Sequence, residues 1–189
     1  AVYGPIFADF SDKIPSWLPQ ELYCRDKKLS TGSVLRFATT GNVFLDLAFV
    51  AENDLFFDER MALTGGSDTE FFFRFVRYGG IIHWCNEAGV TESVPVERMT
   101  LRWLAKRYFR YGSSDVLFWK LNHSIWNTLF WSSRRAVWRF IKHFLSLFVP
   151  GRKRSYYVGH IVQLARPFGV LYGLVGFSYN EYKARHCHD

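Results

Sequence analysis

The chain has 189 residues, of which 49% are hydrophobic and 19% aromatic, and this composition excludes a disordered protein. Charge is divided unevenly, because residues 1–100 carry 9 Lys/Arg and 14 Asp/Glu, whereas residues 101–189 carry 15 Lys/Arg and 3 Asp/Glu. The front part therefore has the composition of an acidic globular domain, while the rear part is basic and aromatic, as in proteins that bind an anionic membrane or a nucleic acid.

Three cysteines (Cys24, Cys85 and Cys187) are too few and too scattered for a disulfide framework, so we expect reduced thiols. The chain begins at Ala1 rather than Met and shows no signal peptide, which favours a fragment or a processed chain. A metal could bind at His186-Cys187-His188, but a frayed terminus is the simpler explanation of this tail.

Short apolar runs in the front part predict strands. Residues 2–10 predict a strand that leads into a turn, and residues 34–47 form an apolar run interrupted by a polar turn at 39–42. Further short strands are predicted at 81–85 and 88–94.

The clearest helix start lies at Thr64-Gly65-Gly66-Ser67-Asp68. Two glycines allow a sharp bend, Ser67 or Asp68 can cap the helix, and Glu70 follows in the first turn. We expect this helix to run to about Tyr78 and to end at Gly79-Gly80.

The rear part predicts three helical segments. The first covers 99–111 and ends at Gly112, and two apolar but basic stretches follow at 129–149 and 155–179. Neither stretch contains 18 uncharged apolar residues, so basic amphipathic helices in a membrane interface are favoured over membrane spans. The alternative is two buried helices of a soluble bundle.

Four segments in order resemble family 2 glycosyltransferases of the GT-A fold. They are VYGPIFADF at 2–10, TTGNVFL at 39–45, LFFDERMALTGGSDTEFFFRFVRYGGIIHW at 55–84 and EAGVTESVPVERMTLRWLAKRYFRYG at 87–112. The third matches the family's pattern of a GG-x-D turn followed by an aromatic helix, a glycine and a strand ending in Trp. The resemblance covers about residues 2–112 and is weak beyond them.

This resemblance implies an α/β fold. Residues 1–112 are expected to be the acceptor-side part of a partial GT-A (Rossmann-like) domain, and residues 113–189 a basic helical region associated with a membrane. The implied activity is inverting transfer of a sugar from a nucleotide-sugar donor to a saccharide or lipid-linked acceptor in surface polysaccharide synthesis. The implied location is the cytoplasmic face of a bacterial inner membrane, with peripheral or monotopic attachment.

Asp68 stands where the family has its catalytic base. A base typically contributes about 10²–10⁴-fold to the rate, and the glycines before Asp68 leave room for a sugar ring. The resemblance thus implies that Gly65, Gly66 and Trp84 bind the acceptor, although a Trp at a strand end is more often a core residue. Without its flanking motifs, Asp68 would be interpreted as a helix cap.

Arg98, Arg102 and Trp103 are expected to contact a diphosphate or the acceptor. A solvated basic face and a core Trp explain Arg102 and Trp103 equally well. Arg98, Arg107 and Arg110 could meet a lipid diphosphate, and plain membrane-facing charges explain these three arginines equally well. This chain has Ser67 where many relatives carry Glu. It also has Met99 where processive relatives carry Gln, which favours addition of a single sugar.

The chain contains no Asp-x-Asp and no Gly-rich phosphate loop. We therefore expect the Mg²⁺ or Mn²⁺ of the intact enzyme to be held by an upstream part, and this chain alone to be nearly inactive. The expected partners are the sugar donor, the acceptor and an anionic membrane surface, without nucleic acid. The alternative function is a basic amphipathic membrane-binding module without catalysis.

Overall fold

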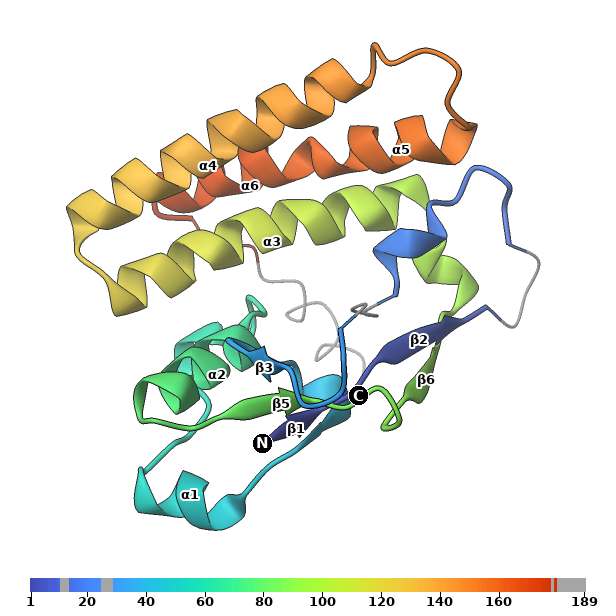
Figure 1. The fold of residues 1–189 in the computed structure, drawn as a ribbon. Helices are drawn as coiled ribbons and strands as arrows, with labels where there is room; N and C mark the ends of the chain where they lie inside the picture. Colours follow the sequence, from blue (N-terminus) through green and yellow to red (C-terminus); the bar gives the residue numbers. More distant parts are fainter. Residues whose placement is uncertain (11–13, 25–28, 178, 180–189) are drawn as a thin grey trace, which may run out of the picture. The chain divides into compact units, whose positions relative to one another are not determined.

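The computed structural model describes residues 1–10, 14–24, 29–177 and 179, and the protein is mixed α/β, as predicted (Figure 1). It contains two compact units. The sheet unit comprises the described residues of Ala1–Ser11, Gln20–Glu59 and Ser67–Val94, and the helical unit those of Asp12–Pro19, Arg60–Gly66 and Pro95–Asp189. The change from sheet unit to helical unit after Val94 lies well before the predicted boundary at 112/113.

A four-stranded sheet with the order β3-β5-β1-β4 organises the sheet unit. Its central strands, β1 (Val2–Tyr3) and β5 (Ile82–Trp84), are parallel, whereas β3 (Val34–Leu35) and β4 (Val43–Phe44) pair antiparallel at the edges. A second, two-stranded sheet pairs β2 (Ile6–Asp9) in parallel with β6 (Val90–Ser93). Strands predicted at 81–85 and 88–94 are thus confirmed as β5 and β6.

The predicted strand at 2–10 is two strands in two different sheets, because it breaks at Gly4-Pro5. A Cβ at Gly4 would lie 2.0 Å from the carbonyl oxygen of Ala88, so only glycine allows the chain to pass this close. The Asn42 side-chain amide also fixes the two chain segments that approach at Gly4, since it donates to the carbonyl oxygens of Pro5 at 3.0 Å and Ala88 at 2.6 Å.

Helix α2 (Ser67–Arg77) starts where the sequence predicted, and it packs the aromatic core of the sheet unit. Phe71, Phe72 and Phe75 form the apolar face of this helix, and they are buried together with Tyr3 and Trp84 of the sheet. The shorter helix α1 (Leu47–Glu52) is capped by Asp46. Four 3₁₀ turns, η1 (Gln20–Leu22), η2 (Thr40–Asn42), η3 (Glu59–Met61) and η4 (Val96–Arg98), complete the short elements.

The helical unit contains α3 (Leu101–Asn122), α4 (Ile125–Ser146), α5 (Arg154–Gln163) and α6 (Ala165–Leu174). In Figure 1, α5 and α6 follow one another and run beside α3 and α4, and α6 packs on both of these helices. The side chain of Thr100 caps α3 and that of Ser124 caps α4.

Gly112 does not end a helix, and this prediction was wrong. It lies inside α3, where a Cβ would be 2.1 Å from the carbonyl oxygen of Arg166. Gly169 of α6 meets α3 in the same way, since its Cβ would lie 1.8 Å from the carbonyl oxygen of Phe109. A glycine at a helix contact therefore looks like a helix end in the sequence, although its role is close packing of two backbones.

No described helix combines the length and the apolar composition that crossing a membrane would require.

Candidate functional site

The bend before α2 depends on its two glycines. Gly65 and Gly66 have φ angles of +75° and +92°, which residues with a Cβ rarely adopt. The turn is tied down at both sides, because Gly65 N–H donates to the carbonyl oxygen of Met61 at 3.1 Å and the Ser114 hydroxyl donates to that of Thr64 at 2.7 Å. The predicted sharp bend is confirmed, while acceptor binding by the two glycines stays a prediction.

Asp68 is the second residue of α2 and is partly exposed. Its Oδ1 atom accepts a hydrogen bond from the N–H of Thr69 at 2.9 Å, and the described part of the chain offers the carboxylate no further hydrogen-bond or ion partner. The next acidic residue of the helix, Glu70, differs sharply. It is buried and engages both Nε and Nη2 of Arg74 at 2.7 Å, and this hydrogen bonding raises the pKa of Arg74. Asp68 is thus the carboxylate of this helix that a ligand can reach.

Trp84 is a core residue, and the prediction that it stacks on an acceptor sugar was wrong. Its side chain is fully buried, and its ring packs edge-to-face against Tyr3 with the centroids 5.6 Å apart. The indole N–H donates to Asn86 Oδ1 at 2.8 Å. Because both faces of the ring lie inside the protein, no sugar can stack on it.

Arginine and aromatic side chains contact one another from the end of η4 into the first half of α3. The guanidinium of Arg98 lies 5.8 Å from the ring centroid of Trp103, and that of Arg107 lies 4.9 Å from it. Arg107 Nε also donates to the Tyr111 hydroxyl at 2.6 Å. We call Arg98, Trp103, Arg107 and Tyr111 the arginine–aromatic row. The sequence grouped Arg98 with Trp103, but it gave Tyr111 no role although Tyr111 lies within the motif at 87–112. Arg102 is exposed and lies outside the row.

The arginine–aromatic row and the glycine turn share the helical unit. A Cβ at Gly65 would lie 3.5 Å from Nη1 of Arg110, so the next arginine of α3 covers this glycine. Asp68 belongs to the sheet unit, and the chain joins it to Gly66 through Ser67 alone.

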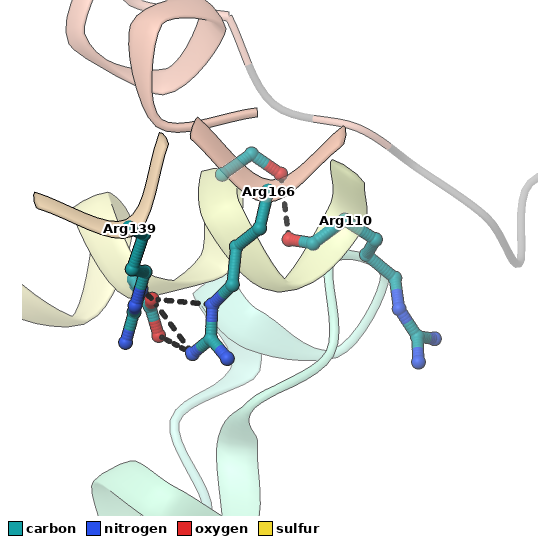
Figure 2. Close-up of polar contacts among 5 residues, drawn as sticks. Arg110, Arg139 and Arg166 are labelled. Atoms are coloured by element: carbon teal, nitrogen blue, oxygen red, sulfur yellow. Dashed lines mark hydrogen bonds and ion pairs between the residues drawn. The ribbon is translucent and has the colours of Figure 1, made fainter. Parts of the chain in front are cut away.

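A charged cluster inside the helical unit was missed by the sequence analysis. Arg139 of α4 and Arg166 of α6 both bind the carboxylate of Asp115 in α3, at 3.0 Å and 2.9 Å (Figure 2). Burial, and then the charge of Arg166, lower the pKa of Arg139. Figure 2 also shows that the Arg110 guanidinium points away from this cluster. The sequence held a signal for this cluster, since Arg139 and Arg166 each interrupt an apolar stretch and a buried charge needs a partner.

Two histidines meet beside that cluster. Nδ1 of His143 in α4 lies 2.9 Å from Nδ1 of His160 in α5. Burial, followed by the nearby charge of His160, lowers the pKa of His143 to about 4, and burial also lowers that of His160. The pair is therefore held in the neutral form, in which one ring donates and the other accepts.

The described residues contain no group of three or more His, Cys, Asp or Glu that could hold a metal ion. They therefore offer no cluster of carboxylates or imidazoles for the expected Mg²⁺ or Mn²⁺. The His186-Cys187-His188 tail lies outside the described residues.

Comparison with known proteins gives a partial relative and no family assignment. No family model and no solved structure match the chain. The succinoglycan biosynthesis protein ExoM of Rhizobium meliloti (strain 1021) is 32% identical to it over 114 residues, which are 60% of this chain and 37% of ExoM. The chain thus spans little more than a third of the length of that relative.

Proposed function

We propose that this chain is the acceptor-side part of an inverting glycosyltransferase that acts in exopolysaccharide synthesis, with Asp68 as the base. The likeness to a succinoglycan biosynthesis protein supports the biosynthetic role, and the ordered motifs around the glycine turn support the transferase. The observation that carries the proposal is the partly exposed Asp68 carboxylate, two residues after a bend whose φ angles favour glycine. Since the chain covers 37% of ExoM, the activity would belong to the whole protein.

In this reaction the Asp68 carboxylate takes the proton of an acceptor hydroxyl while that oxygen attacks the anomeric carbon of the donor sugar. The new C–O bond forms as the bond to the nucleoside diphosphate breaks on the opposite face, which inverts the anomeric centre. The diphosphate leaves with the bonding electron pair. The single hydrogen bond from Thr69 N–H fixes one carboxylate oxygen and leaves the other for the incoming hydroxyl.

The arginine–aromatic row is the part of the helical unit best suited to a phosphate group. Its guanidinium groups present several N–H donors in one plane, which matches the oxygens of a diphosphate. Arg98 and Arg107 are fixed by their contacts with Trp103, and Arg107 also by Tyr111, so little side-chain entropy is lost on binding. We assign this row, with exposed Arg102 beside it, to the diphosphate of the donor or of a lipid-linked acceptor.

The test is the Asp68→Asn variant, made in the longest natural protein that contains this chain. Asn keeps the acceptor for the Thr69 N–H but cannot take a proton, so kcat is expected to fall about 10²–10⁴-fold while the protein stays folded. Transfer would be measured as nucleoside diphosphate released in the presence of acceptor.

The matched control is Asp54→Asn. Asp54 is exposed and has a φ of 50°, which Asn tolerates, so this variant should keep its activity. Near-normal turnover in Asp68→Asn would remove Asp68 from the role of base, whereas equal losses in both variants would point to general damage.

A further inference from the structure

Helix α4 exposes its large apolar side chains and buries Thr128, Ser132, Ala136 and His143. Large side chains at 126, 130, 137, 141 and 144 follow one another at helical spacing, and all five are exposed. We call these residues (Trp126, Phe130, Val137, Ile141 and Phe144) the outer stripe. Exposure reaches 78% at Trp126 and 62% at Phe130, although a helix in water normally buries such side chains.

The opposite side of α4 faces its neighbouring helices with polar groups. Thr128, Ser132 and His143 are buried there, and Arg139 binds Asp115 (Figure 2). In a lipid environment, proteins typically pair their polar groups inside a helix bundle and present apolar side chains on its outer surface.

Small residues bring α3 and α6 together. Gly112 on α3, and Gly169 and Gly173 on α6, are buried, and Gly169 and Gly173 are spaced as G-x-x-x-G. A Cβ at Gly112 or Gly169 would collide with the backbone of the facing helix. Close backbone approach through small residues is typical of helices that associate within lipid, where apolar burial gives no driving force.

The outer stripe continues onto α6. Phe140 of α4 meets Phe168 of α6 edge-to-face with their centroids 6.3 Å apart, and Phe168 and Leu171 are exposed. The apolar surface therefore extends across two neighbouring helices.

The sequence that forms this surface is strongly basic. Residues 116–180 contain 9 Lys/Arg and no Asp or Glu. Arg134 and Lys142 stack on Trp131 and Trp138 at 5.3 Å and 5.2 Å, which places a cation beside each exposed indole. A Trp next to a basic residue suits the boundary between acyl chains and anionic headgroups.

We propose that the outer stripe of α4, together with Phe168 and Leu171 of α6, docks the protein on an anionic lipid surface. The helices lie in the interface, with aromatic side chains among the upper acyl chains and basic residues at the phosphates. Residues 116–180 contain no acidic residue, so their positive charge attracts an anionic lipid surface. A second copy of this chain would carry the same positive charge and be repelled. This inference goes beyond the transferase proposal and does not need it.

The test is co-sedimentation of the full chain with vesicles of phosphatidylcholine, with or without phosphatidylglycerol. Wild type is expected to bind the mixed vesicles and to bind less at high salt. Phe130→Ser combined with Ile141→Ser should weaken this binding at least about tenfold, because two exposed apolar side chains are lost. Replacing Arg152, Lys153 and Arg154, all exposed, by Gln should weaken it about 100-fold.

The control combines Phe44→Ser with Leu47→Ser in the sheet unit, where both side chains, at 78% and 73%, are more exposed than Phe130 and Ile141. This variant should bind like wild type, as should Asp68→Asn, which separates membrane docking from catalysis. Failure of wild type to bind the anionic vesicles would overturn the proposal. A dimer that Phe130→Ser/Ile141→Ser abolishes, without vesicle binding, would also overturn it and make the stripe a self-association surface.

Discussion

The hydroxyl of Ser114 in α3 donates a hydrogen bond to the carbonyl oxygen of Thr64, 50 residues earlier in the chain, at 2.7 Å. Both residues are buried, so no water can replace the bond. It fastens a helix of the basic rear part to the turn from which the Asp68 helix starts. The precision of the bend is therefore set by a residue outside the motif that contains it.

Ser114→Ala should destabilise the protein and impair transfer. The substitution leaves the Thr64 carbonyl buried without this donor, which costs about 1–3 kcal/mol of unfolding free energy. If the turn positions Asp68, kcat should fall while KM for the donor changes little. Denaturant unfolding and steady-state kinetics measure the two effects.

Ser113→Ala is the matched control for that variant. Ser113 is also buried in α3, but its hydroxyl donates to the carbonyl of Arg110 within the same helix, at 3.0 Å. The Ser113→Ala variant should lower kcat much less than Ser114→Ala. Ser114→Thr keeps a hydroxyl and should retain part of the activity that Ser114→Ala loses. An equal loss of kcat in both alanine variants would contradict a positioning role for Ser114.

Gly66→Ala should be more destabilising than Gly79→Ala. Both glycines have left-handed φ angles, +92° and +94°, so each alanine costs about 1–2 kcal/mol in backbone strain. A Cβ at Gly79 meets nothing within 4 Å, whereas one at Gly66 lies 3.1 Å from Cε of buried Met61. The difference between the two denaturation midpoints isolates the cost of crowding at the turn, and a Gly79→Ala loss as large as that of Gly66→Ala would contradict it.

The His143–His160 pair should make the stability fall with acid. The pKa of His143 is lowered to about 4 in the folded protein, while an unfolded histidine titrates at about 6.5. Between these values the unfolded chain binds more protons, so the free energy of unfolding decreases as pH falls through this window. The positive charges of Lys142, Arg139 and Arg166 act in the same direction.

The measurement is Tm between about pH 7.5 and about pH 4.5. His143→Asn removes this titration, so its Tm should fall less over the interval than that of wild type. The control is His123→Asn, at the C-terminal end of α3, which should keep the wild-type decrease. An unchanged decrease in His143→Asn would show that the pair does not contribute to acid sensitivity.

Local sequence was sufficient for elements whose signals are contiguous. Two adjacent glycines, followed by acidic residues and a phenylalanine-rich stretch, were enough to predict where the bend lies and where helix α2 begins, although Ser114 also holds the bend in place. The strands β5 and β6 and the mixed α/β class were predictable for the same reason, because hydrophobic period and turn residues act over a few positions. The assignment of Asp68 as base stays a prediction, since a carboxylate at a helix start is compatible with several roles.

Tertiary contacts decided the rest. The sequence pattern predicted that a helix ends at Gly112, yet α3 continues through it. The glycine is needed there because the backbone of α6 at Arg166 and Gly169 lies close against it. Trp84 was predicted to bind the acceptor but is a core residue, because Tyr3, far away in the chain, packs against its ring. The sequence by itself determined where α2 begins and which segments are apolar or basic, whereas the stretch predicted at 129–149 begins at Ile125 as α4 and the stretch predicted at 155–179 is two helices, α5 and α6. Only the folded chain decided which side of each apolar helix is buried, because burial depends on partners that lie distant in sequence.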